Sequence, residues 1–161
     1  MKRLIAPIRF LVTLGPLGYL PASGTIATVA TMLGLWVLRG IISPAFFVIW
    51  ILPIIALSIV LVQVVLPTFD HDDPPEIVID EVVGFLFAMS FFPRTWVWLM
   101  SGFIVFRFFD IFKPLGIKRL ERLGGAAAVV CDDVLAGFYT QIILLLGAVV
   151  FDLCCAYLKT V

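Results

Sequence analysis

The sequence contains few charged side chains. Only 14% of its 161 residues are Asp, Glu, Lys or Arg, whereas 63% are hydrophobic, and the mean hydropathy is +1.18. Soluble domains carry about 25% charged residues, so this composition argues against an ordinary soluble domain. It indicates a single integral membrane domain over residues 1–161. The formal net charge is zero, and without a basic surface field nucleic acid is not an expected partner.

Histidine and cysteine are also scarce. One histidine, His71, lies in an acidic loop, so a two-histidine phosphatase site is excluded. The three cysteines and this histidine form no zinc-binding pattern. Cys131 has no arginine six residues later, which excludes a cysteine-phosphatase loop. No DxDxT string is present for an aspartyl-phosphate mechanism, and the CDP-alcohol transferase pattern is missing.

Apolar runs of membrane-helix length are present, since a bilayer core takes about 17–25 apolar residues per helix. Two short runs flank Pro93-Arg94. Fusing them would place Arg94 near mid-membrane at a cost of at least about 2.5–3.5 kcal/mol, whereas a hairpin places it at an interface beside Trp96. The sequence therefore predicts an all-α polytopic membrane protein of about five membrane helices, including a short central hairpin. The predicted spans are 25–42, 45–66, 77–92, 96–109 and 134–158.

The hairpin also predicts the sidedness. With residues 1–9 retained as a cytoplasmic start, residues 67–76 and 110–133 fall on the cytoplasmic side. Lys and Arg residues are more frequent on this side, as the positive-inside rule requires. Those inside are Lys2, Arg3, Arg9, Lys113, Lys118, Arg119 and Arg122, and those outside are Arg39, Arg94 and Lys159.

Acidic residues cluster at the heads of apolar runs, where charge beside hydrocarbon is costly. Asp80 and Glu81 begin one run, and Asp132 and Asp133 precede another. Glu76 and Asp80 are four residues apart, so on a helix they would share a face. Carboxylate oxygens are ligands that Mg²⁺ prefers. Each acidic motif alone also fits solvated acids or caps at a helix N-terminus. Gly137, four residues after Asp133, would allow close approach of another helix.

Basic and glycine-rich segments offer phosphate contacts. Arg107, Asp110 and Lys113 are spaced three apart and follow one helical flank; an arginine binds phosphate bidentately and a lysine supplies a point charge. The same residues also fit a membrane anchor with Asp110 as the salt partner. Residues 15–25 form a glycine-rich loop in which Ser23 or Thr25 can cap the next helix, whose N-terminus can receive phosphate.

Together the segments predict metal-assisted phosphoryl hydrolysis at one membrane face. A cation neutralises phosphate and acidifies water, and Arg and Lys stabilise the transition-state oxygens. The alternatives are a small membrane cation transporter and a non-catalytic membrane scaffold. A transporter would favour charges near mid-membrane on several helices, whereas these acids lie mainly at one edge.

The strings PASGT, EIVIDEVVG, FRFFDIFKP and CDDVLAG, in this order, resemble the phosphatidylglycerophosphatase A family from about Thr13 to Thr140. The resemblance implies a mostly helical, Mg²⁺-dependent lipid phosphatase of the bacterial inner membrane. It would be multi-pass, with its active site facing the cytoplasm. Its substrate would be phosphatidylglycerophosphate and its product phosphatidylglycerol. No oligomeric state is implied.

The resemblance also implies site residues. The metal region would contain Glu76, Asp80, Glu81, Asp110, Asp132 and Asp133. The substrate phosphate would contact Gly24, Thr25, Arg107 and Lys113. The residues implied to be catalytic are Asp80, Glu81, Arg107, Asp110, Lys113 and Asp133.

Overall fold

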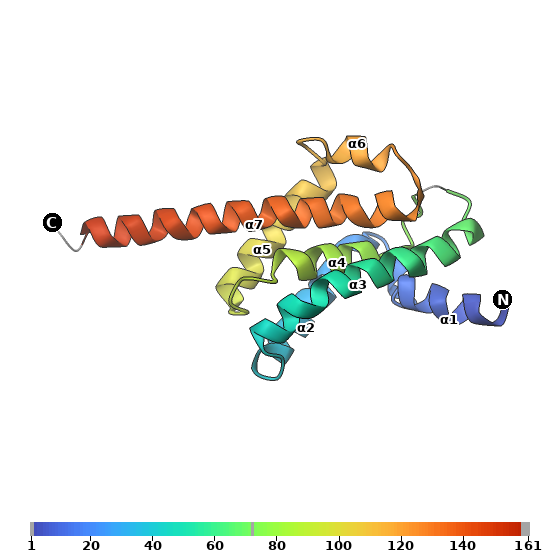
Figure 1. The fold of residues 1–161 in the computed structure, drawn as a ribbon, viewed down its shortest axis with the longest axis horizontal. Coiled ribbons are helices and arrows are strands. Elements are labelled where there is room, and N and C mark those ends of the chain that lie inside the picture. The colour runs from blue at the N-terminus through green and yellow to red at the C-terminus, as the bar shows by residue number, and fades with distance from the viewer. Residues whose placement is uncertain (1, 72, 159–161) are drawn as a thin grey trace.

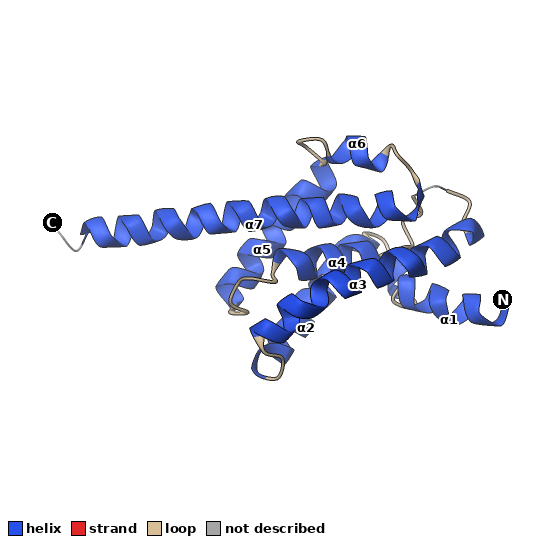
Figure 2. Cartoon of the chain, viewed as in Figure 1, coloured by secondary structure: helices blue, strands red, loops and turns tan. Residues whose placement is uncertain are grey.

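The computed structural model describes residues 2–71 and 73–158, and every regular element in this part of the chain is a helix (Figure 1, Figure 2). The predicted all-α class is therefore confirmed. Lys159, expected on the outer side, lies outside the described residues. The elements are α1 (Lys2–Val12), η1 (Leu17–Tyr19), α2 (Ser23–Val37), η2 (Leu38–Gly40), α3 (Pro44–Val65), η3 (Leu66–Thr68), α4 (Ile79–Ala88), α5 (Trp96–Phe112), α6 (Ile117–Glu121) and α7 (Gly125–Leu158).

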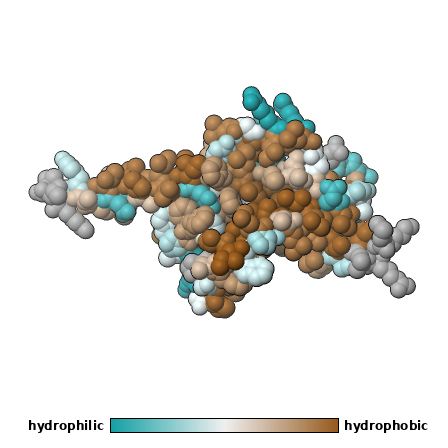
Figure 3. Space-filling model, viewed as in Figure 1, coloured by the Kyte–Doolittle hydropathy of each residue, from teal (hydrophilic) through white to brown (hydrophobic). Residues whose placement is uncertain are grey.

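Two of the described helical segments are long and apolar enough to cross a bilayer. They are Ala45–Thr68, which is α3 with the turn that follows it, and Gly125–Leu158, which is α7. Figure 3 shows hydrophobic surface over α3 and over the part of α7 that extends beyond the other helices. Apolar surface on this scale is unusual for a soluble monomer, so the two helices indicate a membrane protein.

Two of the other expected membrane helices are shorter than a full span. α2 and α4 contain 15 and 10 residues, and α5 with 17 reaches only the lower limit of the about 17–25 residues that a crossing takes. The hairpin around Pro93 is present, because the loop between Ala88 and Trp96 separates α4 from α5. At about 15 Å, α4 is too short to cross a bilayer by itself. The predicted count of about five membrane helices is not confirmed.

The last helix begins at Gly125, not near Val134 as predicted. Gly124 and Gly125 have φ values of 70° and 79° and so terminate the preceding turn. The alanines that follow favour helix, and α7 therefore starts well before its most apolar part. Asp132 and Asp133 consequently lie inside this helix and not ahead of it.

The short helix α4 lies at the centre of the bundle and packs against α2, α3, α5 and α7. Phe85 and Ala88 on it, and Met89 directly after it, are completely buried. The Phe85 ring meets Phe106 of α5 edge to face, with the ring centroids 5.7 Å apart. Burying a side chain of this size contributes about 1.5–3 kcal/mol. Packing around α4 brings the starts of α2 and α4, the end of α5 and the early turns of α7 to one end of the molecule.

Candidate metal and phosphate site

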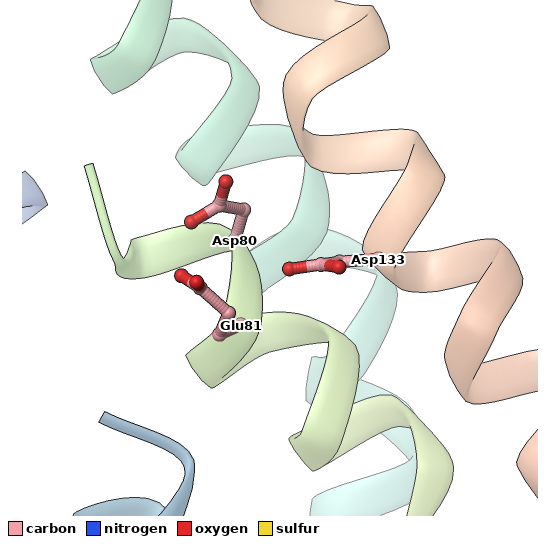
Figure 4. A group of neighbouring side chains, drawn as sticks. All are labelled: Asp80, Glu81 and Asp133. Carbon is pink, nitrogen blue, oxygen red and sulfur yellow. The ribbon is translucent and has the colours of Figure 1, made fainter. Parts of the chain in front are cut away.

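Three carboxylates from two helices form the centre of the site. Asp80 and Glu81 lie in the first turn of α4, and Asp133 points toward them from α7 (Figure 4). One oxygen from each side chain lies within 4.8 Å of the other two. Asp80 and Asp133 are buried and Glu81 is half-buried. The structure thus brings together acids that are more than fifty residues apart in the sequence, in a group that can share one ion.

Two glycines make this meeting possible. A Cβ at Gly84 would lie 2.7 Å from the carbonyl oxygen of Asp133, and a Cβ at Gly137 would lie 2.5 Å from the carbonyl oxygen of Gly84. Larger residues would force α4 and α7 apart. Asp80 and Asp133 each lie one helical turn before one of these glycines, so the close crossing sets the distance between the acids. The predicted role of Gly137 in close helix approach is confirmed.

Burial and mutual repulsion act strongly on the carboxylates of α4. Desolvation raises the pKa of Asp80 well above its ordinary value, and the charge of Glu81 raises it further. Desolvation also raises the pKa of Glu81 to about 7. Asp80 Oδ1 and Glu81 Oε2 are buried and have no hydrogen-bond partner among the described residues. Buried charges are normally paired or bound to metal, so these unsatisfied oxygens fit a cation.

The donor set restricts the kind of cation. All three groups are carboxylates, and hard oxygen donors suit Mg²⁺, Ca²⁺ or Mn²⁺ better than Zn²⁺. Neither His71, exposed in its loop, nor Cys131 belongs to the group. A divalent cation therefore agrees with the residues present, and its identity as Mg²⁺ stays a prediction.

Two cationic side chains flank the acids. Arg107 pairs with Asp110 one turn further along α5. Lys113 follows the end of α5 with a φ of 45°, and its Nζ donates to Asp132 Oδ2 over 2.7 Å. The expectation that all three share one helical flank is thus confirmed for Arg107 and Asp110 but wrong for Lys113, because α5 ends at Phe112. The other oxygen of Asp132 accepts the backbone N–H of Asp133 over 2.9 Å.

The acids open toward a larger cavity. A cavity of about 150 Å³ holds the acidic group together with Asp110, Lys113 and Asp132. A second cavity of about 570 Å³ is lined by the glycine-rich loop, the start of α2 and Arg107. Pro75, Glu81 and Asp110 line both cavities. A phosphate group in the larger cavity would therefore lie next to the acidic group.

The start of α2 forms one wall of the larger cavity. Ala22 occupies the N-cap with a φ of 57° and provides no side-chain cap. Ser23 donates instead to the carbonyl oxygen of Pro75 over 2.7 Å, so the expectation that Ser23 or Thr25 caps the helix is wrong. Gly24 and Thr25 line the cavity. A Cβ at Gly24 would overlap the Glu81 carboxylate and lie 3.3 Å from Arg107 Nη1.

Glu76 is placed differently from the prediction. It lies in a turn, because α4 begins only at Ile79, and the expected helical face shared with Asp80 is therefore wrong. The backbone N–H of Ile77 donates to the carbonyl oxygen of Pro74 over 3.0 Å, which closes a turn around Glu76. Glu76 lines the larger cavity and lies outside the group of three carboxylates. A Cβ at Gly18 would overlap the Glu76 carbonyl oxygen, so glycine lets these two turns pack closely.

Sequence reasoning missed two residues of the site. Asp73 lines the acidic cavity, and the available signal was an acid directly before the proline pair that turns the chain into α4. Gly84 was quoted only as part of a motif, although it lies one helical turn after Asp80 and makes the closest approach to α7.

Comparison of the sequence with known proteins gives one family, which a family model and two named relatives share. A family model described as phosphatidylglycerophosphatase A matches residues 10–148. A Haemophilus influenzae protein named phosphatidylglycerophosphatase A is 34% identical over 126 residues, which cover 76% of this chain and 77% of that protein. An Escherichia coli protein of the same name is 34% identical over 67 residues, 40% of this chain and 39% of that protein.

A Bacteroides thetaiotaomicron protein carries the provisional name phosphatidylinositol-3-phosphatase. It is 41% identical over 76 residues, which cover 45% of this chain and 48% of that protein. The matched part of the chain thus spans about half the length of this relative and about three quarters of the Haemophilus protein. No solved structure matches the chain.

Proposed function

The chain belongs to the phosphatidylglycerophosphatase A family, and we propose that it hydrolyses phosphatidylglycerophosphate to phosphatidylglycerol and inorganic phosphate. The observation that carries this proposal is the meeting of three carboxylates, Arg107 and the uncapped start of α2 around two adjoining cavities. This combination provides both an ion site and an anion site, which is what hydrolysis of a phosphate monoester requires.

In the proposed reaction the oxygen of water bonds to phosphorus. The bond between phosphorus and the glycerol oxygen breaks, and that oxygen leaves with a proton. Negative charge on the phosphoryl oxygens has to be stabilised in the transition state. Arg107 is suited to this because its buried Nε has no hydrogen-bond partner among the described residues. The N–H groups of Gly24 and Thr25 at the start of α2 add a second source of positive potential.

We propose Mg²⁺ as the cation, with Asp80, Glu81 and Asp133 as the residues that hold it. A bound divalent cation supplies positive charge and Lewis acidity next to the phosphate. Asp132 positions Asp133 by accepting its backbone N–H, and Lys113 balances the charge of Asp132. Asp110, which lines both cavities, holds Arg107 in the wall of the larger one. Glu76, which lines the larger cavity, is retained as a further metal candidate.

We also propose that the site faces the cytoplasm of a bacterial inner membrane. Exposed Lys118, Arg119 and Arg122 lie between α5 and α7, next to the acidic end of the molecule. The positive-inside rule places this end in the cytoplasm. The hairpin of α4 and α5 would enter the membrane from that side and return to it, so the predicted sidedness does not require α4 to span the bilayer.

The decisive experiment measures phosphate release by the purified full chain in detergent. Phosphatidylglycerophosphate is compared with phosphatidylinositol 3-phosphate and phosphatidic acid, each with Mg²⁺ and with EDTA. We expect Mg²⁺-dependent release that is fastest from phosphatidylglycerophosphate. Arg107→Gln should abolish release, whereas Arg119→Gln, which removes the same charge from an exposed position, should not.

The alternatives give different results in the same preparation. Cation flux into proteoliposomes without any phosphate release would favour a transporter. A scaffold would tolerate the combined replacement of Arg107, Asp110 and Asp133 by alanine in a lipid-synthesis assay. Either result would overturn the proposed hydrolase.

A further inference from the structure

A second polar cavity lies at the other end of the helices. It has a volume of about 250 Å³ and is lined by Arg39, Ser90, Phe92, Pro93, Arg94 and Thr95. Arg39 lies beyond the end of α2, and Ser90 lies beyond the end of α4. Both helices begin at the acidic site, so this cavity is separated from that site by their whole length. Figure 1 shows the α2–α3 and α4–α5 connections on the same side of the bundle.

The charge of this cavity is positive. Two of its six lining residues are arginines, and none is acidic. No carboxylate in the described part of the chain pairs with Arg39 or Arg94. Uncompensated guanidinium groups around a cavity are the usual arrangement for binding phosphate or carboxylate.

Both arginines are held in place by the protein. Arg94 is only 9% exposed; its Nη1 donates to the carbonyl oxygen of Ile42 over 2.8 Å, and its guanidinium lies 4.6 Å from the centre of the Phe47 ring. Arg39 Nη1 donates to the carbonyl oxygen of Trp36 over 3.0 Å. Since a guanidinium has five N–H donors, each arginine keeps donors for a ligand. Little side-chain entropy remains to be lost by the buried Arg94 on binding.

The start of α5 adds to the positive potential. Thr95 is the N-cap residue of this 17-residue helix, and its side chain makes no capping hydrogen bond. The same residue lines the cavity. First-turn N–H groups that lack a cap attract anions through the helix dipole. Two arginines, a free hydroxyl and a helix N-terminus therefore meet at one place.

Tryptophans place this cavity at the depth of a membrane interface. Trp36 meets Trp96 edge to face with ring centroids 6.1 Å apart, and Trp98 stacks on Phe92 at 5.1 Å. Tryptophan is enriched where lipid headgroups meet hydrocarbon. A phosphate at that depth belongs to a lipid headgroup more readily than to the aqueous phase.

We propose that this cavity binds the phosphate of an anionic phospholipid headgroup. The proposal rests on the membrane setting that α3 and α7 indicate and not on the proposed reaction. Binding there would anchor the α4–α5 loop to the α2–α3 connection, which Arg94 already joins through Ile42.

Native mass spectrometry of the full chain can test this binding. The protein in detergent is titrated with phosphatidylglycerol or phosphatidylcholine, in EDTA so that turnover is suppressed. The complexes are then released from the detergent in the mass spectrometer. We expect one phosphatidylglycerol to be retained preferentially. Arg39→Gln should weaken its binding about tenfold or more, the effect of losing one charge-assisted hydrogen bond. Arg119→Gln is the matched control at an exposed position, and it should retain the lipid.

The remaining arms separate the possible outcomes. Arg107→Gln should keep this lipid while losing phosphate release, so failure of the proposed reaction is distinguishable from failure of this site. Displacement of the lipid by millimolar inorganic phosphate would overturn the headgroup assignment in favour of a free anion. Equal retention by wild type and Arg39→Gln would overturn the site itself. Arg94→Lys provides a second variant, and its unfolding midpoint shows whether lost binding reflects lost folding.

Discussion

Gly137 of α7 packs directly against Gly84 of α4, so that a Cβ at position 137 would lie 2.5 Å from the Gly84 carbonyl oxygen. This contact fixes the register between the two helices that carry the acidic group. Asp133 and Asp80 lie one turn before these glycines and therefore face each other across the same crossing. The ion site is thus a consequence of helix packing as much as of the acids themselves.

Gly137→Ala should damage both folding and activity. The added methyl group would press on the α4 backbone, and overpacking of this kind costs about 1–3 kcal/mol. Moving α7 outward would also separate Asp133 from Asp80. Gly147→Ala is the matched control, because nothing lies within 4 Å of a Cβ there on the same helix. Unfolding midpoints and phosphate release would be compared, and equal behaviour of the two variants would contradict this role of the crossing.

Asp80→Asn should abolish turnover while the protein stays folded. The amide keeps the shape of the side chain but removes a negative charge from a group of mutually repelling carboxylates. Without metal the variant should therefore be at least as stable as the wild type. Phosphate release should fall by more than about 100-fold, because even residues that only support a metal ligand contribute about 10–100-fold. Normal activity would exclude Asp80 as an essential ligand.

Mg²⁺ should stabilise the folded protein directly. An ion present at about 100 times its Kd adds about 2.7 kcal/mol, which for a chain of this size corresponds to about 5–10 °C in the unfolding midpoint. The measurement is thermal unfolding in detergent with Mg²⁺ or EDTA. Asp133→Asn should lose most of this shift, and Asp152→Asn, on the exposed end of α7, should keep it. A full shift in Asp133→Asn would place the ion elsewhere.

Lys113 and Asp132 should behave as a coupled pair. Their side chains are 18% and 4% exposed and form a 2.7 Å contact. Lys113→Met would leave Asp132 uncompensated, and breaking a buried pair costs about 3–5 kcal/mol. Adding Asp132→Asn should recover much of that loss, which a double-mutant cycle on unfolding free energies would measure. Additive effects would show that the two residues do not stabilise each other.

The sequence alone predicted much of this site because its polar residues are so few. Asp80, Glu81, Arg107, Asp110, Asp132 and Asp133 stand out in an apolar chain, and the structure gathers all of them around the two cavities. The all-helical class and the break near Pro93 followed from apolar runs and from the cost of placing Arg94 in hydrocarbon.

What the sequence did not predict depends on packing and on local backbone conformation. Glu76 lies in a turn closed by the hydrogen bond from Ile77 N–H to the Pro74 carbonyl oxygen, and Lys113 turns away from α5 through a positive φ. α7 begins at Gly125 because the three alanines that follow favour helix, whereas the predicted span began only after the charged Asp132 and Asp133. Gly84 has no side chain that could suggest a role, so only its close packing against the Asp133 backbone shows why glycine is needed there.

Gly24→Ala tests the link between the ion site and the phosphate site. A methyl group there would overlap the Glu81 carboxylate and crowd Arg107. Helix propensity alone would favour alanine by about 0.5–1 kcal/mol, so a loss of activity could not be attributed to a weaker helix. Displacing both side chains should lower kcat/KM by about 100-fold, the usual effect of a misplacement of about 1 Å.

Gly34→Ala on the same helix has nothing within 4 Å of its Cβ and should retain wild-type kinetics. If both variants keep wild-type kcat/KM, then Gly24 does not join the two halves of the site, and the substrate phosphate has to bind away from the start of α2.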